Sequence, residues 1–271
     1  MNIFESIFMG IIQGLTEFIP VSSSGHLVLL QHFLGWGESE NILFEVILHL
    51  GTLFAVLLYF HKTIWELIKS LFSWKNTVNR EIHRKNRNLI VYLVISTLFT
   101  GVYYYFFGDA FRDIYQMPMF VASLLLVTGI IIFVSDFFRE GDIPASNMGF
   151  LRAITIGLCQ GMAILPGISR SGTTISSSLA MGIKRKDAAQ YSFLLSIPAI
   201  IAANISEFKA LVNFEVGQMQ SYLAGFISSF VVGYLIIAFL IRMIESNRLK
   251  YFAYYCWIIG LISILLLSLG L

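Results

Sequence analysis

Gly10–His26 reads GIIQGLTEFIPVSSSGH, and Gly157–Thr173 reads GLCQGMAILPGISRSGT. A shift of 147 residues aligns the two stretches, and six positions are then identical: Gly10, Gln13, Gly14, Ser22, Ser24 and Gly25 fall on Gly157, Gln160, Gly161, Ser169, Ser171 and Gly172. Each copy is an apolar run that breaks at a proline into a Ser/Gly loop and then resumes. Duplicated, interrupted segments in a hydrophobic chain point to a binding site near the middle of a membrane.

The composition is that of a membrane protein. Of the 271 residues, 57% are hydrophobic and 13% are charged, whereas a soluble domain has about 25% charged residues. The formal net charge of +2 is too small to suggest a nucleic-acid partner. Cys159 and Cys256 lie in apolar segments and predict neither a disulfide framework nor a metal cluster. Glu5 stands where a signal peptide would have a basic flank, so we expect the N-terminus to be mature structure.

Six segments are long enough to cross about 30 Å of hydrocarbon. They are Asn41–Phe60, Leu89–Phe107, Met117–Phe138, Ala188–Ile205, Met219–Ile241 and Tyr251–Leu271. The arms that follow the two breaks, His26–Leu34 and Thr173–Ile183, reach only part of the way. Each motif is therefore predicted to form a re-entrant helical hairpin, and the alternative is a full span kinked at the proline.

These elements predict an all-α integral membrane protein with six transmembrane helices and two re-entrant helical hairpins. Each half of the chain holds one hairpin and three spans, so the second half enters the membrane from the opposite side. The expected architecture is an inverted-topology repeat in one membrane domain, residues 1–271, with repeat one at about 1–140 and repeat two at about 147–271. A pseudo-two-fold axis in the membrane plane would bring the two loop tips together.

Lys and Arg residues are unevenly distributed about these spans. Fifteen of the 18 lie on the side opposite the N-terminus, two lie on the N-terminal side, and Arg170 lies in a motif loop. The positive-inside rule then places both termini outside. The loop His61–Asn88 carries an apolar stripe flanked by Lys and Arg, which predicts an interfacial amphipathic helix on the inner leaflet.

Glu17 is the first candidate for chemistry. It follows Gln13 by four residues, so the two side chains share one helix face. An ionisable group at membrane depth is costly and suggests function. Glu17 could bind a metal or act as a base, or it could be a structural partner for backbone amides. Gln13 has a copy at Gln160, so loop scaffolding and ligand binding both stay open.

The first loop supplies Ser22, Ser23, Ser24, Gly25 and His26 at the start of a helix. Free amides and the helix dipole favour an anion there. The serine hydroxyls supply donors or a nucleophile, and His26 can shuttle a proton near neutral pH. The alternative is an N-cap run with a structurally satisfied interior histidine.

The second loop repeats this anion-binding pattern and adds Arg170. A guanidinium at membrane depth needs an anionic partner and fits phosphate bidentately. A structural salt bridge to Glu17 is the alternative. With Arg170, the phosphate-binding candidates of this loop are Ser169, Ser171, Gly172, Thr173 and Thr174.

Two further polar residues lie one turn apart on the first span. Glu45 and His49 could face the outer mouth of the cavity, although His49 could equally be packed against a structural partner. Ser23 is the candidate nucleophile, because the 147-residue offset pairs it with Arg170 on the facing tip. His26 would pass the proton and Glu17 would activate Ser23 or hold a metal. Direct attack by water stays the alternative.

At these loops the chain resembles the undecaprenyl-pyrophosphate phosphatase family of the bacitracin-resistance (BacA/UppP) type. The family's acidic motif, Glu or Gln followed four residues later by Glu, reads Gln13 and Glu17 here. Its PGxSRSxxT motif reads Pro166 to Thr174. Because the first acidic position is Gln, a two-carboxylate metal scheme rests on Glu17 alone.

The resemblance implies an integral membrane enzyme that removes the terminal phosphate of undecaprenyl pyrophosphate and so recycles the envelope-polymer lipid carrier. It also implies a divalent cation, Mg²⁺ or Ca²⁺, and a site open to the outer face of the bacterial cell membrane. The expected partners are the pyrophosphate lipid and membrane lipid, with a homodimer as a candidate assembly and no nucleic acid.

Two other function classes were compared with this one. Type-2 phosphatidic-acid phosphatases also contain SGH and SR, but no histidine follows Arg170 in the stretch SGTTISSSLAMG. A polyprenyl-phosphate flippase or transporter is the more serious alternative, because inverted repeats with re-entrant loops are typical of transporters.

Overall fold

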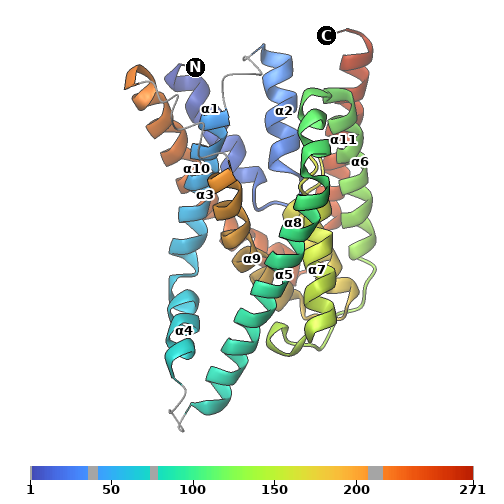
Figure 1. Ribbon diagram of the computed structural model, residues 1–271. Helices are drawn as coiled ribbons and strands as arrows, with labels where there is room; N and C mark the ends of the chain where they lie inside the picture. Colours follow the sequence, from blue (N-terminus) through green and yellow to red (C-terminus); the bar gives the residue numbers. More distant parts are fainter. Residues whose placement is uncertain (1, 36–41, 74–78, 207–215, 271) are drawn as a thin grey trace.

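The structure is a computed structural model and describes residues 2–35, 42–73, 79–206 and 216–270. In those residues the chain is helical, with one isolated parallel bridge between Ile143 and Ile183. Figure 1 shows both termini at one end of the bundle, and α4 with the start of α5 at the other end. The α-helices are α1 (Ile3–Thr16), α2 (Ser23–Leu34), α3 (Ile42–Tyr59), α4 (His61–Phe72), α5 (Arg80–Arg112), α6 (Pro118–Ser135), α7 (Phe150–Met162), α8 (Arg170–Ala180), α9 (Arg185–Ser206), α10 (Met219–Glu245) and α11 (Lys250–Ser268).

The long apolar helices match the predicted spans. Helices α5, α6, α9, α10 and α11 are each long and apolar enough to cross a membrane. Helix α3 together with α4, bent by 73° at their junction, makes a sixth candidate. The prediction of an all-α integral membrane protein is confirmed. Asn41, the first residue of the first predicted span, lies outside the described residues.

The predicted amphipathic helix between residues 61 and 88 is correct only in its first part. Helix α4 covers the apolar stripe, residues 74–78 lie outside the described part of the chain, and Arg80 already begins α5. The Ser70 hydroxyl of α4 lies 2.9 Å from His83 Nδ1 and accepts from Asn86 Nδ2 at 3.0 Å. These bonds join α4 to the first turns of α5, which the sequence periodicity did not reveal.

Each motif forms two short helices joined by a turn, as the interrupted pattern predicts. Helix α2 begins after Ser22, whose Oγ accepts from the Gly25 amide at 3.3 Å. Helix α8 begins after Ser169, whose Oγ accepts from the Gly172 amide at 3.0 Å. A side-chain oxygen at the N-cap satisfies one of the free amides of the first turn. The shared Ser-x-x-Gly spacing therefore produces the same helix start twice.

The duplicated glycines let helices of the two halves of the chain approach closely. A Cβ on Gly10 of α1 would lie 2.5 Å from the Gly225 carbonyl oxygen of α10. A Cβ on Gly157 of α7 would lie 2.4 Å from the Ser96 carbonyl oxygen of α5. Small residues four positions apart permit such backbone contacts between membrane helices. Helix α1 accordingly packs on α10, and α7 on α5.

Gly157→Ala is expected to destabilise the fold through this contact. The added Cβ meets backbone atoms of Ser96, which cannot rotate away, and overpacking of this kind costs about 1–3 kcal/mol. Gly101 of α5 is the matched control, because a Cβ there has no atom within 4 Å. Thermal unfolding in detergent should show a lower Tm for Gly157→Ala and no loss for Gly101→Ala. Equal Tm values for the two variants would contradict the close approach of α7 and α5.

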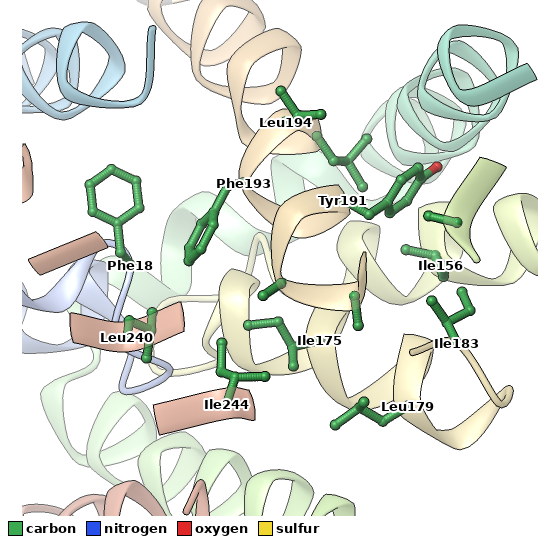
Figure 2. Close-up of a cluster of buried hydrophobic side chains, with 14 of the residues drawn as sticks. Phe18, Ile156, Ile175, Leu179, Ile183, Tyr191, Phe193, Leu194, Leu240 and Ile244 are labelled. Carbon is green, nitrogen blue, oxygen red and sulfur yellow. The ribbon is translucent and has the colours of Figure 1, made fainter. Parts of the chain in front are cut away.

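The core lies around α8, α9 and α10, below the two loops. Figure 2 shows Ile175 and Leu179 of α8 beside Leu240 and Ile244 of α10, with Phe193 of α9 between them and α1. The Phe193 ring meets the Phe18 ring edge-on, with centroids 5.8 Å apart and an interplanar angle of 85°. Phe18 follows Glu17 directly, so this aromatic contact fixes the backbone that carries the acidic side chain.

Candidate functional site

The two loop tips are in direct contact. The Gly167 amide donates to Ser22 Oγ at 3.1 Å, and Ser171 Oγ donates to the Ile19 carbonyl at 3.3 Å. A Cβ on Gly25 would lie 2.9 Å from Gly167 Cα, so only glycine fits at this crossing. The predicted meeting of the tips is therefore seen between two segments more than 140 residues apart in the sequence.

Backbone with positive φ accompanies this contact. Ser22 has φ of 70° and Gly167 has φ of 97°. A non-glycine residue with positive φ is uncommon, and such residues concentrate at functional sites. At Ser22 the cap to α2 and the bond from Gly167 hold this backbone in place.

Glu17 is the centre of the site. Its side chain is buried, and its Oε2 accepts from Ser23 Oγ at 2.6 Å and from Gln13 Nε2 at 3.0 Å. Its Oε1 accepts from Arg170 Nη2 at 2.9 Å. Three of the residues predicted from the sequence are thus gathered around one carboxylate, and the salt bridge considered as an alternative for Arg170 is present.

Arg170 is held at its other end by α9. Its Nη1 donates to the Ser192 carbonyl at 3.4 Å, and its side chain is 15% exposed. A buried ion pair needs such additional hydrogen bonds, because desolvation of the two charges is expensive. The guanidinium therefore stands at the start of α8 with a fixed orientation and a small exposed part.

His49 lies closer to Glu17 than its predicted place at the cavity mouth. Its Nε2 is 3.7 Å from Glu17 Oε2, and its Nδ1 bonds the Glu45 carbonyl oxygen at 2.8 Å. A carbonyl can only accept, so Nδ1 carries the proton in this bond. Glu45 itself accepts from Gln31 Nε2 at 3.1 Å, which ties α3 to α2. In the neutral ring, Nε2 of His49 is then the acceptor, and it faces the carboxylate region.

His26 is bound to partners other than those predicted. Its Nδ1 lies 2.8 Å from the Ser22 carbonyl oxygen and its Nε2 lies 2.9 Å from the Tyr255 hydroxyl. The His26 and Tyr255 rings are nearly parallel, with an interplanar angle of 7°. Because Nδ1 must donate to the carbonyl, Nε2 of the neutral ring accepts from Tyr255. No hydrogen bond joins His26 to Glu17, Ser23 or Arg170, all of which the structure describes.

The remaining loop hydroxyls are mostly occupied within the loops. Ser24 Oγ lies 3.4 Å from Ser22 Oγ, and Ser171 Oγ lies 3.2 Å from Ser169 Oγ. Together with the caps at Gly25 and Gly172, these contacts make the serine runs scaffolds of the two helix starts. Their phosphate-binding role stays a prediction.

The two threonines of the second loop differ from each other. Thr174 Oγ1 bonds Ser192 Oγ at 2.6 Å and so ties α8 to α9. Thr173, the offset counterpart of His26, has a buried hydroxyl with no hydrogen-bond partner among the described residues.

Sequence reasoning missed three residues that hold the site together. The Ser192 carbonyl accepts a hydrogen bond from Arg170, and the Tyr255 hydroxyl bonds the His26 ring. Thr128 of α6 donates to the Gly167 carbonyl at 2.7 Å and accepts from the Ser169 amide at 3.0 Å. The 147-residue offset pairs Ser192 with Glu45, so the repeat itself could have indicated Ser192. Tyr255 and Thr128 have no comparable signal, because the same offset pairs Tyr255 with Gly108 and carries Thr128 beyond the last residue.

The oxygen atoms around Glu17 could serve as ligands of a divalent cation only in part. Within the described ranges, no group of three or more His, Cys, Asp or Glu side chains could hold a metal ion. Gln13, whose Nε2 donates to Glu17, also has a buried amide oxygen, Oε1, without a hydrogen-bond partner in the described residues. Mg²⁺ is commonly bound by one or two carboxylates together with substrate phosphates. One carboxylate and one free amide oxygen fit a cation that is completed by a bound pyrophosphate.

Known proteins resemble this chain along nearly its whole length. The family model described as "Bacitracin resistance protein BacA" matches residues 6–262, which include both loops and every residue of the site. The undecaprenyl-diphosphatase of Methanosphaera stadtmanae is 42% identical, and the match covers 98% of each chain. Those of Halothermothrix orenii and Alkaliphilus metalliredigens are 39% and 38% identical with the same coverage. On this match, and with both loop signatures meeting at one buried site, the chain belongs to the BacA family of bacitracin resistance proteins.

Proposed function

We propose that this chain is an integral membrane phosphatase that hydrolyses undecaprenyl pyrophosphate to undecaprenyl phosphate and inorganic phosphate. Its relatives carry the name undecaprenyl-diphosphatase, which identifies the substrate. One observation carries the chemistry: Glu17 accepts from a hydroxyl nucleophile, Ser23, and from a guanidinium, Arg170, at the same time. Carboxylate, hydroxyl and guanidinium are a general base, a nucleophile and a phosphate clamp for phosphoryl transfer.

Arg170 receives the pyrophosphate in this proposal. Its planar guanidinium can pair two phosphoryl oxygens, and it stabilises the negative charge that spreads onto them in the transition state. The N-terminal turns of α2 and α8 lie beside it and favour an anion through their amides. Gly25, Gly172 and the loop serines would contribute donors as the phosphate replaces contacts within the loops.

Ser23 attacks the terminal phosphorus. Its Oγ forms the new P–O bond while the proton passes to Glu17 Oε2, which is 2.6 Å away. The bond from the terminal phosphorus to the bridging oxygen breaks, and undecaprenyl phosphate leaves with the bridging oxygen. Water then attacks the phosphoserine, and release of inorganic phosphate restores the Ser23 hydroxyl. This geometry favours Glu17, rather than His26, as the base for Ser23.

The two histidines take supporting parts in the same proposal. Nε2 of His49 is near enough to the carboxylate to receive or return a proton after small movements of either side chain. His26 holds the backbone of the strained Ser22 through its Nδ1 and contacts α11 through Tyr255. Its proton-shuttle role would require the Tyr255 hydroxyl to exchange for a substrate or water oxygen.

A divalent cation, Mg²⁺ or Ca²⁺, completes the proposal. Glu17 and Gln13 Oε1 are the residues that would hold it. When bound, such an ion neutralises charge on the pyrophosphate and makes the terminal phosphorus easier to attack.

Phosphate release by the purified protein tests the proposed activity directly. In detergent micelles no transport can occur, so a flippase or transporter would release no phosphate. We expect one inorganic phosphate per molecule of undecaprenyl pyrophosphate and accumulation of undecaprenyl phosphate, measured by colorimetry and lipid chromatography. Release no higher than in the protein-free control would contradict the phosphatase assignment.

The chain is a multi-pass membrane protein, and the proposal places both termini and the site opening outside the bacterial cell membrane. A cysteine substituted for Ser39, a position outside the described residues, should then react with an impermeant thiol reagent on intact cells. A cysteine substituted for Asn79, at the opposite end before α5, should stay unlabelled. The opposite labelling pattern would reverse the orientation and the direction in which the site opens.

A further inference from the structure

A cavity lies away from the two loops. It measures about 360 Å³ and opens where α3 and α10 end and α9 begins. In Figure 1 the junction of α3 with α4 lies in the half of the bundle away from the termini. The ends of membrane helices lie at the level of the lipid headgroups. The cavity therefore faces the interface of one leaflet.

A chain of three aromatic rings lies between this cavity and Glu17. Phe60, which lines it, has its ring 6.0 Å from that of Phe193, and Phe193 contacts Phe18 beside Glu17. Phe18 and Phe193 are fully buried. A ligand in this cavity would thus occupy a site distinct from that of the pyrophosphate.

Charged groups of both signs line the rim of the cavity. Lys186 Nζ and Glu245 Oε1 are 3.9 Å apart, which is a loose pair. Arg242 and Gln190 also line it, and neither side chain has a hydrogen bond or ion pair with any described residue. The rim therefore offers two cationic side chains, one carboxylate and one amide to a ligand that carries a negative and a positive charge.

Polarity changes along α10. Glu245 and Arg242 line the cavity near the end of α10, and the apolar Ile241 and Ala238, which come earlier on the helix, line it as well. Seven residues of helix separate Ala238 from Glu245, or about 10 Å. Charged and apolar side chains along one stretch of helix suit a ligand that combines a charged headgroup with apolar chains, as a phospholipid does.

We propose that this cavity binds a membrane phospholipid whose headgroup carries both a phosphodiester and a primary ammonium group. The phosphodiester pairs with Arg242 and Lys186, and the ammonium group donates to Glu245. A free phosphate has no ammonium group to pair with the Glu245 carboxylate, which repels it, and it has no apolar chains. A quaternary ammonium headgroup cannot donate a hydrogen bond to Glu245, so phosphatidylethanolamine fits better than phosphatidylcholine.

Lipid binding to the delipidated full-length protein in detergent micelles tests this assignment. Native mass spectrometry would compare phosphatidylethanolamine, phosphatidylcholine and phosphatidylglycerol of identical chains, with inorganic phosphate and glycerophosphoethanolamine as soluble probes. We expect phosphatidylethanolamine to bind most tightly and the soluble probes to bind weakly. Arg242→Gln should weaken its binding by about tenfold, the loss expected for one charge-assisted hydrogen bond. Glu245→Gln should remove the preference over phosphatidylglycerol, and Arg248→Gln, a basic residue that does not line the cavity, is the matched control.

Several outcomes would overturn the proposal. Equal affinity of wild type for the three lipids would show that the headgroup is not read. Unchanged binding to Arg242→Gln would place the lipid elsewhere, and binding of inorganic phosphate as tight as that of the lipid would make the ligand a free anion. None of these results depends on the phosphatase reaction, because Arg242 and Glu245 do not touch the Glu17 site, and phosphate release in detergent confirms that each variant is folded.

Discussion

Ser23→Ala is expected to reduce phosphate release by a thousandfold or more, because the substitution removes the attacking oxygen. Loss of a covalent nucleophile typically costs on the order of three or more powers of ten in turnover. Ser23 Oγ lies 2.6 Å from Glu17 Oε2, the shortest contact that Glu17 makes in the site, and this distance suits proton transfer. Substrate binding should be nearly unchanged, since Arg170 and the helix starts stay in place.

The covalent step can be checked separately from the rate. Wild-type protein quenched during turnover should carry a phosphoserine at Ser23, detectable by mass spectrometry, and Ser23→Ala should not. Ser177→Ala is the matched control, because the Ser177 hydroxyl of α8 donates to the Thr174 carbonyl at 3.1 Å and has no contact with Glu17. Retention of about a tenth of wild-type turnover by Ser23→Ala would exclude the covalent route. Water activated by Glu17 or His26 would then be the better account.

Arg170→Lys is expected to lower turnover by at least about tenfold although the charge is kept. The arginine donates from Nη2 to Glu17 and from Nη1 to Ser192 across a planar fork. One ammonium group cannot reach both partners and also pair two phosphoryl oxygens. The loss should appear mainly in kcat, since the interactions with spreading charge are strongest in the transition state.

Arg170→Ala should have a second consequence that the lysine variant avoids. It leaves the buried Glu17 carboxylate without its cationic partner, and breaking a buried pair costs about 3–5 kcal/mol. Thermal unfolding should therefore show a lower Tm for Arg170→Ala, whereas Arg170→Lys should lose turnover without that loss of stability. Arg152→Lys is the matched control, because among the described residues Arg152 donates only to the carbonyls of Met181 and Met148. Near-normal turnover by a folded Arg170→Lys variant would remove Arg170 from the reaction.

Local features of this protein follow from the sequence alone. The long apolar runs predicted the spanning helices, and the break at each proline predicted a Ser/Gly loop followed by a short helix, although α2 and α8 begin three residues before the predicted arms at His26 and Thr173. These features depend on residues three or four positions apart, which lie side by side on one helix turn. The pairing of Gln13 with Glu17 is of the same kind, since the two residues are one turn apart.

The contacts that make the site were decided by the tertiary structure. The sequence left open whether Arg170 faces phosphate or Glu17, and it placed His49 at the cavity mouth and His26 beside the nucleophile. Packing of α3 brings His49 to the carboxylate, and packing of α11 brings Tyr255 to His26. Helical periodicity shows which face of a helix is buried but not which distant helix meets that face. The breaks in the two motifs were therefore readable from the sequence, whereas the partners of Arg170, His26 and His49 depend on how α3, α9 and α11 pack around the loops.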